Sequence, residues 1–307
     1  MSEILQKIRD LIREDIGKRG LATDPAANLL TDCAGDFAGA CRSIADAPQP
    51  AVAIVTGFFI PHAKRGETDG PLGALFLARA LVPLDIQVAL VTDEFCARAL
   101  EAGLDACHLN KAVPLITLPS PALASSMNEA EYWQTFSKQT HRLSHLIALE
   151  RAGPNYNNRC LTMRGLDITE QMSPAHFLFA AAARENISTI GIGDGGNEIG
   201  MGKIPRDIIG RNIPRGELVA CRVPTDYLIV CGISNWGAYG LAAGVRFLRG
   251  KANAGELFDP DMERRLLQVM VERGSLVDGV TGQRTATVDG IAFDRYGDKL
   301  RQLAEIQ

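Results

Sequence analysis

Six short apolar segments, rich in β-branched residues, constrain the fold of this 307-residue chain more than any other feature of its sequence. Each segment is apolar at successive positions and ends in a polar or glycine-rich turn, and most are followed by a helical pattern. Such runs are typical of strands buried on both faces of a parallel sheet, which need helical crossovers between them. The six segments are 51–57, 88–93, 114–119, 145–150, 189–194 and 227–232.

This pattern predicts an α/β fold, with an open, mostly parallel, Rossmann-like sheet and helices on both of its faces. No repeat or Pro/Ser-rich linker divides the chain, so we expect a single domain over residues 1–307. Apolar residues at helical spacing predict an N-terminal helix over residues 2–19. Residues 277–307 are expected to form a small C-terminal appendage, made of a hairpin and a helix.

Composition excludes several classes of protein. The formal net charge is −4, which argues against a nucleic-acid partner, because such binders usually carry a basic face. No apolar run reaches the ~18 residues of a membrane-spanning helix, and the acidic N-terminus is unlike a targeting peptide. The seven cysteines form no C-x-x-C pair, which favours a reducing compartment. We therefore expect a cytoplasmic protein with no membrane partner, and a homo-oligomer is left open.

Polar side chains follow five of the six segments, where a parallel sheet usually binds its ligand. Because the carboxyl ends of parallel strands share one edge, we expect these side chains to meet in one crevice. In chain order they are Glu67, Asp69, Asp93, Glu150, Asp194, Asn197, Glu198, Ser234 and Asn235.

The turn from Asp194 to Glu198 carries the clearest signal. Two glycines separate a carboxylate from an amide and a second carboxylate, so the chain can bend its oxygen atoms around one point. Oxygen ligands suit a hard divalent cation such as Mg²⁺ or Mn²⁺ rather than zinc. We expect Glu150, Asp194 and Glu198, together with Asn197, to hold such a cation.

Each of these residue types also has a structural interpretation. Asp69 and Asp93 can cap helices, Glu150 and Arg151 can form a local ion pair, and Asn157 can satisfy a turn. The G-x-G-x-x-G match at 191–196 lacks the helix that a dinucleotide fingerprint needs at its third glycine. No G-x-S-x-G elbow supports a serine hydrolase.

Taken together, several motifs resemble the D-glutamate cyclase family. They are GFFIPHAKRGETDGPLGA (57–74), VTDE (91–94), ERAGPNYNN (150–158), GIGDGGNEIGMG (191–202), CGISNWGAYGL (231–241), and VDGVTG with ATVDG (277–290). The resemblance covers nearly the whole chain. It implies a lyase of amino-acid metabolism that converts D-glutamate to 5-oxo-D-proline with a divalent metal, preferably manganese. The preference for the D-enantiomer rests on the resemblance alone.

The chemistry of ring closure suggests a role for each residue. Glu67 or Asp93 would take the ammonium proton, and Asp69 would position the first loop. Arg151, Asn157 and the Ser234-Asn235 turn would bind the α-carboxylate. Asp278 is a further candidate if the appendage folds over the crevice.

Two other functions stay open at this point. A metal-dependent phosphate-ester hydrolase could use the same crevice of acids and cation. A non-catalytic nucleotide-binding module could use the 191–196 turn to cradle a phosphate.

Overall fold

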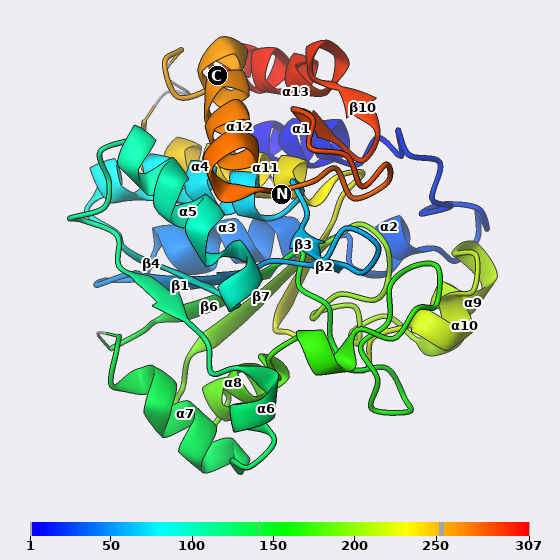
Figure 1. Ribbon diagram of the computed structural model, residues 1–307. Helices are drawn as coiled ribbons and strands as arrows, with labels where there is room; N and C mark the ends of the chain where they lie inside the picture. The colour runs from blue at the N-terminus through cyan, green and yellow to red at the C-terminus, as the bar shows by residue number, and fades with distance from the viewer. Residues whose placement is uncertain (1, 141, 252–254, 307) are drawn as a thin grey trace.

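A six-stranded parallel sheet forms the centre of the computed structural model, which describes residues 2–140, 142–251 and 255–306 (Figure 1). The predicted open, Rossmann-like α/β fold is therefore confirmed. In spatial order the strands are β5 (Leu115–Thr117), β4 (Gln87–Thr92), β1 (Ala51–Thr56), β6 (His145–Leu149), β7 (Ser188–Gly193) and β8 (Tyr227–Val230). Two short antiparallel pairs lie outside this sheet, β2 (Phe59–Ile60) with β3 (Arg65–Gly66) and β9 (Thr287–Val288) with β10 (Ile291–Ala292).

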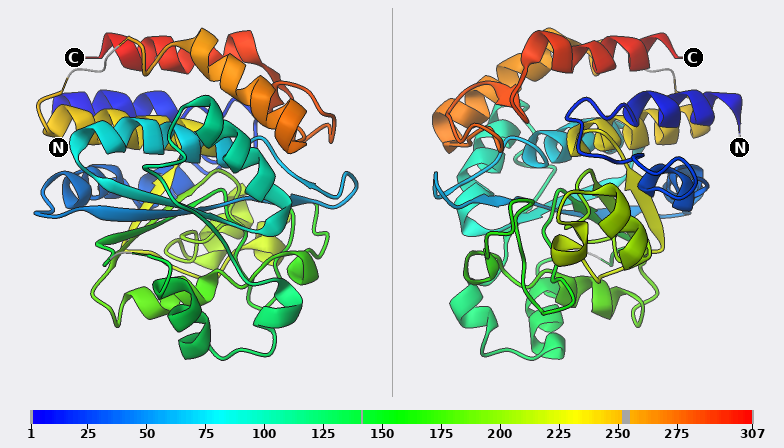
Figure 2. Two further views of the ribbon diagram at one scale, coloured as in Figure 1. Left: turned by 60° about the vertical axis from the view of Figure 1, so that its left-hand side comes forward. Right: turned by 90° about the vertical axis from the view of Figure 1, so that its right-hand side faces the viewer.

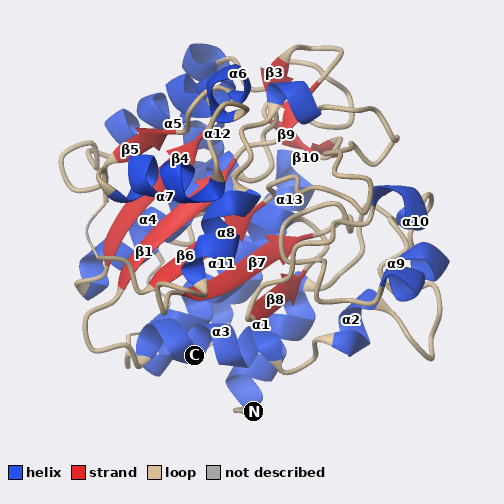
Figure 3. Ribbon diagram, turned by 90° about the horizontal axis from the view of Figure 1, so that it is seen from below, coloured by secondary structure: helices blue, strands red, loops and turns tan. Residues whose placement is uncertain are grey.

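The strand order reverses between β1 and β6. The chain starts at β1, moves outward through β4 to β5, returns to β6 beside β1, and then moves the other way to β8. In such sheets the crevice beyond the carboxyl ends of the two central strands is the usual ligand site. The register pairs Thr56 with Leu149 and Leu149 with Ile192, so the loops that follow these three strands begin side by side. Figure 3 shows long loops gathered on this side of the sheet.

Alternating side chains on the strands build two cores. Val52 and Ile54 of β1 belong to the larger core, whereas Ala53 and Val55 face the smaller one. Helices cover both faces, and on one face they form two layers with α12 and α13 outermost (Figures 1 and 2). On the side of the larger core lie α1 (Glu3–Ile12), α3 (Asp36–Ala45), α4 (Pro71–Leu81), α5 (Glu94–Ala106), α11 (Ser234–Leu248), α12 (Pro260–Gly274) and α13 (Phe293–Glu305).

The opposite face and the periphery carry shorter helices. They are α2 (Leu29–Asp32), α6 (Pro121–Ala124), α7 (Glu129–Ser137), α8 (His176–Ala182), α9 (Arg206–Asn212) and α10 (Gly216–Val219). Helices α7 and α8 pack beneath the sheet with Tyr132, Phe136 and Leu178 in the smaller core. None of the helices in the described parts of the chain is both long and apolar enough to cross a membrane.

The N-terminal helix is shorter than the sequence predicts. The expected helix over 2–19 ends at Ile12, after burying Leu5, Ile8 and Ile12. Beyond it, the Asp15 carboxylate accepts hydrogen bonds from three backbone N–H groups, those of Arg19 (2.8 Å), Gly20 (2.9 Å) and Leu21 (3.1 Å). This side chain offers the backbone an alternative to helix, so the chain turns and carries Arg19 to the carboxyl edge of the sheet.

The C-terminal segment folds into the expected hairpin and helix, formed by β9, β10 and α13. Asp289 and Gly290 make the tight turn with φ of 55° and 74°. Asp278 organises the preceding loop, because its carboxylate accepts hydrogen bonds from Val280 N, Thr281 N, Thr287 Oγ1 and Gly290 N. Asp278 therefore acts as a loop anchor in the structure.

Candidate active site

A cavity of about 380 Å³ opens at the carboxyl edge of the sheet. Five regions of the sequence contribute to it: the segment after α1, the loop after β1, the loop after β6, the loop after β7, and the C-terminal appendage. Its charged and amide lining residues are Arg19, Glu67, Glu150, Arg164, Asn197 and Asp289.

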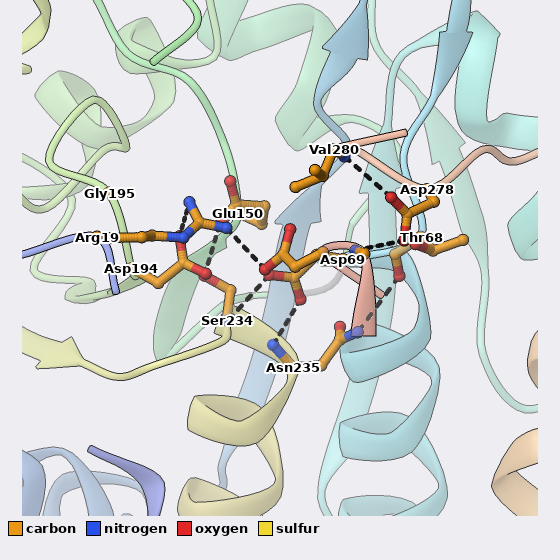
Figure 4. Close-up of polar contacts among 12 residues, drawn as sticks. Arg19, Thr68, Asp69, Glu150, Asp194, Gly195, Ser234, Asn235, Asp278 and Val280 are labelled. Carbon is orange, nitrogen blue, oxygen red and sulfur yellow. Dashed lines mark hydrogen bonds and ion pairs between the residues drawn. The ribbon is translucent and has the colours of Figure 1, made fainter. Parts of the chain in front are cut away.

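Three buried carboxylates meet beside this cavity. Each of Asp69, Glu150 and Asp194 places a side-chain oxygen within 4.8 Å of the other two (Figure 4). The three residues lie after β1, β6 and β7, so the strand reversal brings them together. A set made only of carboxylate oxygens suits a hard divalent cation, and this cluster could hold one.

Local backbone structure fixes two of these acids. Asp69 accepts the first N–H groups of α11, with Oδ2 at 3.0 Å from Ser234 N and Oδ1 at 2.8 Å from Asn235 N. Glu150 adopts the left-handed backbone region, with a φ of 44°, and its Oε2 accepts a hydrogen bond of 2.5 Å from Ser234 Oγ. A non-glycine residue held in this region at a site is a form of strain that often accompanies function.

Asp194 differs from both neighbours because neither of its buried carboxylate oxygens accepts a hydrogen bond from the residues that the structure describes. Arg19 Nη1 lies 2.8 Å from Asp194 Oδ1 as an ion pair, without the geometry of a hydrogen bond. The same guanidinium contacts Asp289 Oδ2 through Nη2 at 2.7 Å. Buried polar atoms in native proteins are nearly always hydrogen-bonded, so orphaned carboxylate oxygens indicate a missing partner.

The electrostatics of the cluster also indicate a missing positive partner. Burial is the main cause that raises the pKa of Glu67 and Glu150 well above the ordinary value, and the charges of neighbouring acids add to it. The same two causes raise the pKa of Asp69 to about 7. Burial also raises the pKa of Asp194, although Arg19 opposes the shift. Burial alone would lower the pKa of Arg19, but Asp194 and Asp289 raise it well above its usual value. The site is therefore short of positive charge, which a divalent cation would supply.

Glu67 points into the cavity from the loop after β1. The lack of a side chain at Gly279 makes room for it, since a Cβ there would lie 2.0 Å from Glu67 Oε2. The C-terminal appendage thus shapes the wall around this carboxylate.

Glu198 is predicted to be a cation ligand, but its side chain binds the backbone of its own turn. Its carboxylate accepts three consecutive backbone N–H groups, with Oε1 at 3.0 Å from Asp194 N and 2.7 Å from Gly195 N, and Oε2 at 2.7 Å from Gly196 N. The amides that could cradle a phosphate therefore hold an internal anion instead. Asn197 does reach the cavity: its Nδ2 donates to Leu161 O at 2.7 Å, and its buried Oδ1 has no hydrogen-bond partner.

Asp93 and Arg151 form a closed pair away from the acidic cluster. Arg151 is fully buried, contacts Asp93 through Nη1, and donates to Gly57 O at 3.3 Å and Ser173 O at 2.7 Å. Asp93 Oδ1 accepts the Ser173 N–H at 2.9 Å. Neither residue lines the cavity, and their charged groups contact each other and the backbone.

The remaining predicted residues are engaged with the backbone. Asn235 Oδ1 accepts the N–H groups of Gly70 (2.8 Å) and Gly73 (2.7 Å), and so caps α4 across the sheet edge. Ser234 donates to Glu150, as described above. Asn157 is exposed in a turn, where its N–H donates to Asn155 Oδ1 at 2.9 Å.

Three charged residues of the cavity, Arg19, Arg164 and Asp289, are not among the predicted site residues. Arg19 falls in the predicted amphipathic helix, and nothing in its local sequence marks it as a site residue. Asp289 stands before Gly290, and this dipeptide indicates a hairpin turn rather than a ligand site. Only the folded chain places Arg19 between Asp194 and Asp289.

Comparison with known proteins agrees with the motifs of the sequence. A family model described as D-glutamate cyclase-like, C-terminal, matches residues 8–304. The human protein named D-glutamate cyclase, mitochondrial, is 30% identical over 332 aligned residues, which cover 98% of this chain and 52% of the human protein. The chain thus spans about half the length of this relative. The resemblance inferred from the sequence is confirmed, and the chain belongs to the D-glutamate cyclase-like family.

Proposed function

We propose that this protein is a metal-dependent lyase that cyclises D-glutamate to 5-oxo-D-proline with loss of water. The observation that carries the proposal is the cluster of Asp69, Glu150 and Asp194, whose buried oxygens lie within 4.8 Å of one another beside a cavity. The family and the name of the human relative supply the substrate.

Asp69, Glu150 and Asp194 would hold the divalent cation, and the unpaired Oδ1 of Asn197 is close enough to the cavity to assist. Mn²⁺ is the proposed ion, with Mg²⁺ as the alternative, and the preference for manganese rests on the family resemblance. When bound, the cation would polarise the γ-carboxylate and stabilise the negative charge that develops on its oxygen.

Glu67 is the proposed general base. Ring closure requires the α-ammonium group to lose a proton before its nitrogen attacks the carbon of the γ-carboxyl group. Glu67 lines the cavity, and its raised pKa makes its carboxylate a better proton acceptor than an exposed glutamate. The cavity would also hold the substrate folded, and orientation of this kind supplies a large part of the rate of intramolecular reactions.

Arg19 and Arg164 are the proposed partners of the substrate carboxylates, since both guanidinium groups line the cavity. Their assignment replaces Arg151, Asn157 and the Ser234-Asn235 turn, none of which lines the cavity. Asp93 is likewise replaced as base, because it pairs with Arg151. Asp69 moves from positioning the loop to binding the cation.

The two other functions receive less support. A nucleotide-binding module would need free amides at the 191–196 turn, but three of them donate to Glu198. A phosphate-ester hydrolase would share the cation, yet the family argues for an amino-acid substrate.

The cytoplasmic location stays a prediction, because the human relative is named as a mitochondrial protein. The oligomeric state is equally open.

Mass spectrometry of reactions with each enantiomer of glutamate tests the proposal. We expect 5-oxoproline from D-glutamate with added Mn²⁺, much less from L-glutamate, and none after chelation. Absence of product from both enantiomers, with Mn²⁺ or Mg²⁺ present, would refute the proposed reaction. A generic phosphate ester in a parallel assay checks the competing hydrolase function.

A further inference from the structure

The cavity beside the acidic cluster is lined by many apolar side chains. Its volume of about 380 Å³ lies in the range of ~300–1,000 Å³ that holds drug-sized ligands, which is generous for glutamate alone. The apolar wall is formed by Phe58, Ile60, Pro61, Met163, Leu166 and Val280. Most of this wall therefore has no polar group to offer a small dicarboxylic acid.

Two large apolar side chains stand exposed at the mouth of this cavity. Leu166 is 50% exposed and Val280 is 49% exposed, and exposed apolar surface beside a site is characteristic of ligand binding. The backbone of both is held in place. Leu166 N–H donates to Thr162 Oγ1 at 3.1 Å. Val280 N–H donates to Asp278 Oδ1 at 3.0 Å, as Figure 4 shows. Arg164 Nη2 links the two loops through Val280 O at 3.3 Å.

The charges of the lining also bear on the substrate. Three carboxylates, those of Glu67, Glu150 and Asp289, stand against two guanidiniums, those of Arg19 and Arg164. Free D-glutamate brings two further carboxylates and one ammonium group. A γ-amide of D-glutamate brings one carboxylate fewer, so it meets less repulsion in the same cavity.

The chemistry of ring closure favours the same class of compound. A free carboxylate is a poor electrophile, whereas an amide carbonyl is neutral. In the amide reaction the α-nitrogen forms a bond to the γ-carbonyl carbon, and the bond from that carbon to the amide nitrogen breaks. The proton lost by the α-amino group passes to the departing nitrogen. The products are 5-oxo-D-proline and a free amine, and no further reactant is needed.

We propose that this enzyme acts on γ-substituted D-glutamyl amides, whose apolar substituent lies between Leu166 and Val280 in the outer part of the cavity. The inference rests on the proposed function, because the glutamyl part would occupy the same acidic site. It adds a class of substrate in which an amine, rather than water, is released.

A series of amides tests the inference. D-Glutamate, D-glutamine, and the γ-ethylamide and γ-benzylamide of D-glutamate are compared by mass spectrometry of 5-oxoproline and of the released amine. We expect kcat/KM to rise along the series, with the benzylamide at least about tenfold above the free acid. Reactions without enzyme, and with Asp194→Asn, correct for spontaneous ring closure.

Variants at the mouth separate the apolar contact from general effects. Leu166→Asp is expected to lower the ratio of kcat/KM for the benzylamide to that for D-glutamate by at least about fivefold. Leu123→Asp is the matched control, because Leu123 is 53% exposed on α6 and does not line the cavity. It should leave the ratio unchanged.

Each outcome decides between the two proposals. Cyclisation of D-glutamate without any reaction of the amides would overturn the inference and leave the proposed function intact. Equal rates for all amides, with Leu166→Asp no different from Leu123→Asp, would remove the apolar subsite. If neither the acid nor the amides react, the proposed function falls, and the inference falls with it.

Discussion

Two buried aspartates at the same edge of the sheet have opposite surroundings. Asp93, after β4, gives one oxygen to Arg151 and the other to the Ser173 N–H. Asp194, after β7, accepts no hydrogen bond on either oxygen from the described residues; it forms an ion pair with Arg19 and lies among further acids. A buried carboxylate whose oxygens are all hydrogen-bonded is a structural element, whereas one with free oxygens among other acids favours a bound cation. The difference identifies which end of the crevice is built for chemistry.

The largest effect is expected for Asp194→Asn. Removing a hydrogen-bond partner of a metal ligand costs 10–100-fold in metal affinity or activity, so loss of a proposed ligand should cost more than about a hundredfold in kcat/KM. The melting temperature should change little, because the substitution removes one of three clustered buried carboxylates, and Arg19 keeps its ion pair with Asp289. Activity assays and thermal unfolding of the same preparation measure both quantities. Full activity would exclude Asp194 as a ligand.

Asp93→Asn should act on stability instead. It leaves Arg151 buried without its counter-charge, and breaking such a pair costs about 3–5 kcal/mol of unfolding free energy. Urea unfolding measures this loss. The double variant Asp93→Asn/Arg151→Met should recover part of it, since no charge is then left unpaired. An Asp93→Asn protein that is stable but inactive would contradict the structural role of Asp93, which would then belong with the functional acids.

The pH dependence of stability should come partly from the other end of β6. His145 starts this strand, and its ring nitrogens contact Ser144 Oγ at 2.8 Å and Ser43 Oγ at 3.1 Å. Burial lowers its pKa to about 4 from 6.5, so the unfolded chain binds a proton first as the pH falls. The stability from this group is complete above pH 6.5 and is lost between pH 6.5 and 4, by roughly 3 kcal/mol.

Urea unfolding at pH 7.5 and pH 4.5 measures that loss, and His145→Gln should reduce it. Part of the slope should persist in this variant, because burial also lowers the pKa of His176 to about 4. An unchanged slope in His145→Gln would show that its ring is not a source of the pH dependence.

Cation binding should raise the free energy of unfolding, by slightly less than the loss expected for His145. An ion that binds only the folded chain raises the unfolding free energy by about 2.7 kcal/mol at a hundredfold excess over its Kd. We expect Mn²⁺ to raise the melting temperature of the wild type and of Leu123→Asp, and chelator to reverse the rise. Asp194→Asn should not respond. An equal rise in Asp194→Asn would place the cation elsewhere.

The sequence located the site more closely than it assigned the roles within it. Asp69, Glu150 and Asp194 were all singled out, since each follows a strand and strand ends share an edge. Asp69 and Asp93 were nevertheless indistinguishable, because both are acids in loops before helices. What separates them is the partner each meets: the N-terminus of α11 in one case and Arg151 in the other.

The apolar, β-branched runs of the sequence are enough to predict the parallel sheet, because such runs favour strands that are buried on both faces. The sequence also determined that the family's motifs fall at the strand ends. Three features become visible only in the folded chain: Glu198 binds its own turn, the first helix ends at Ile12, and Arg19 reaches Asp194. Local patterns fix which atoms a segment can bury. The role of a charged side chain depends on the hydrogen-bond and ion-pair partners that distant segments supply, and a local sequence pattern does not identify those partners.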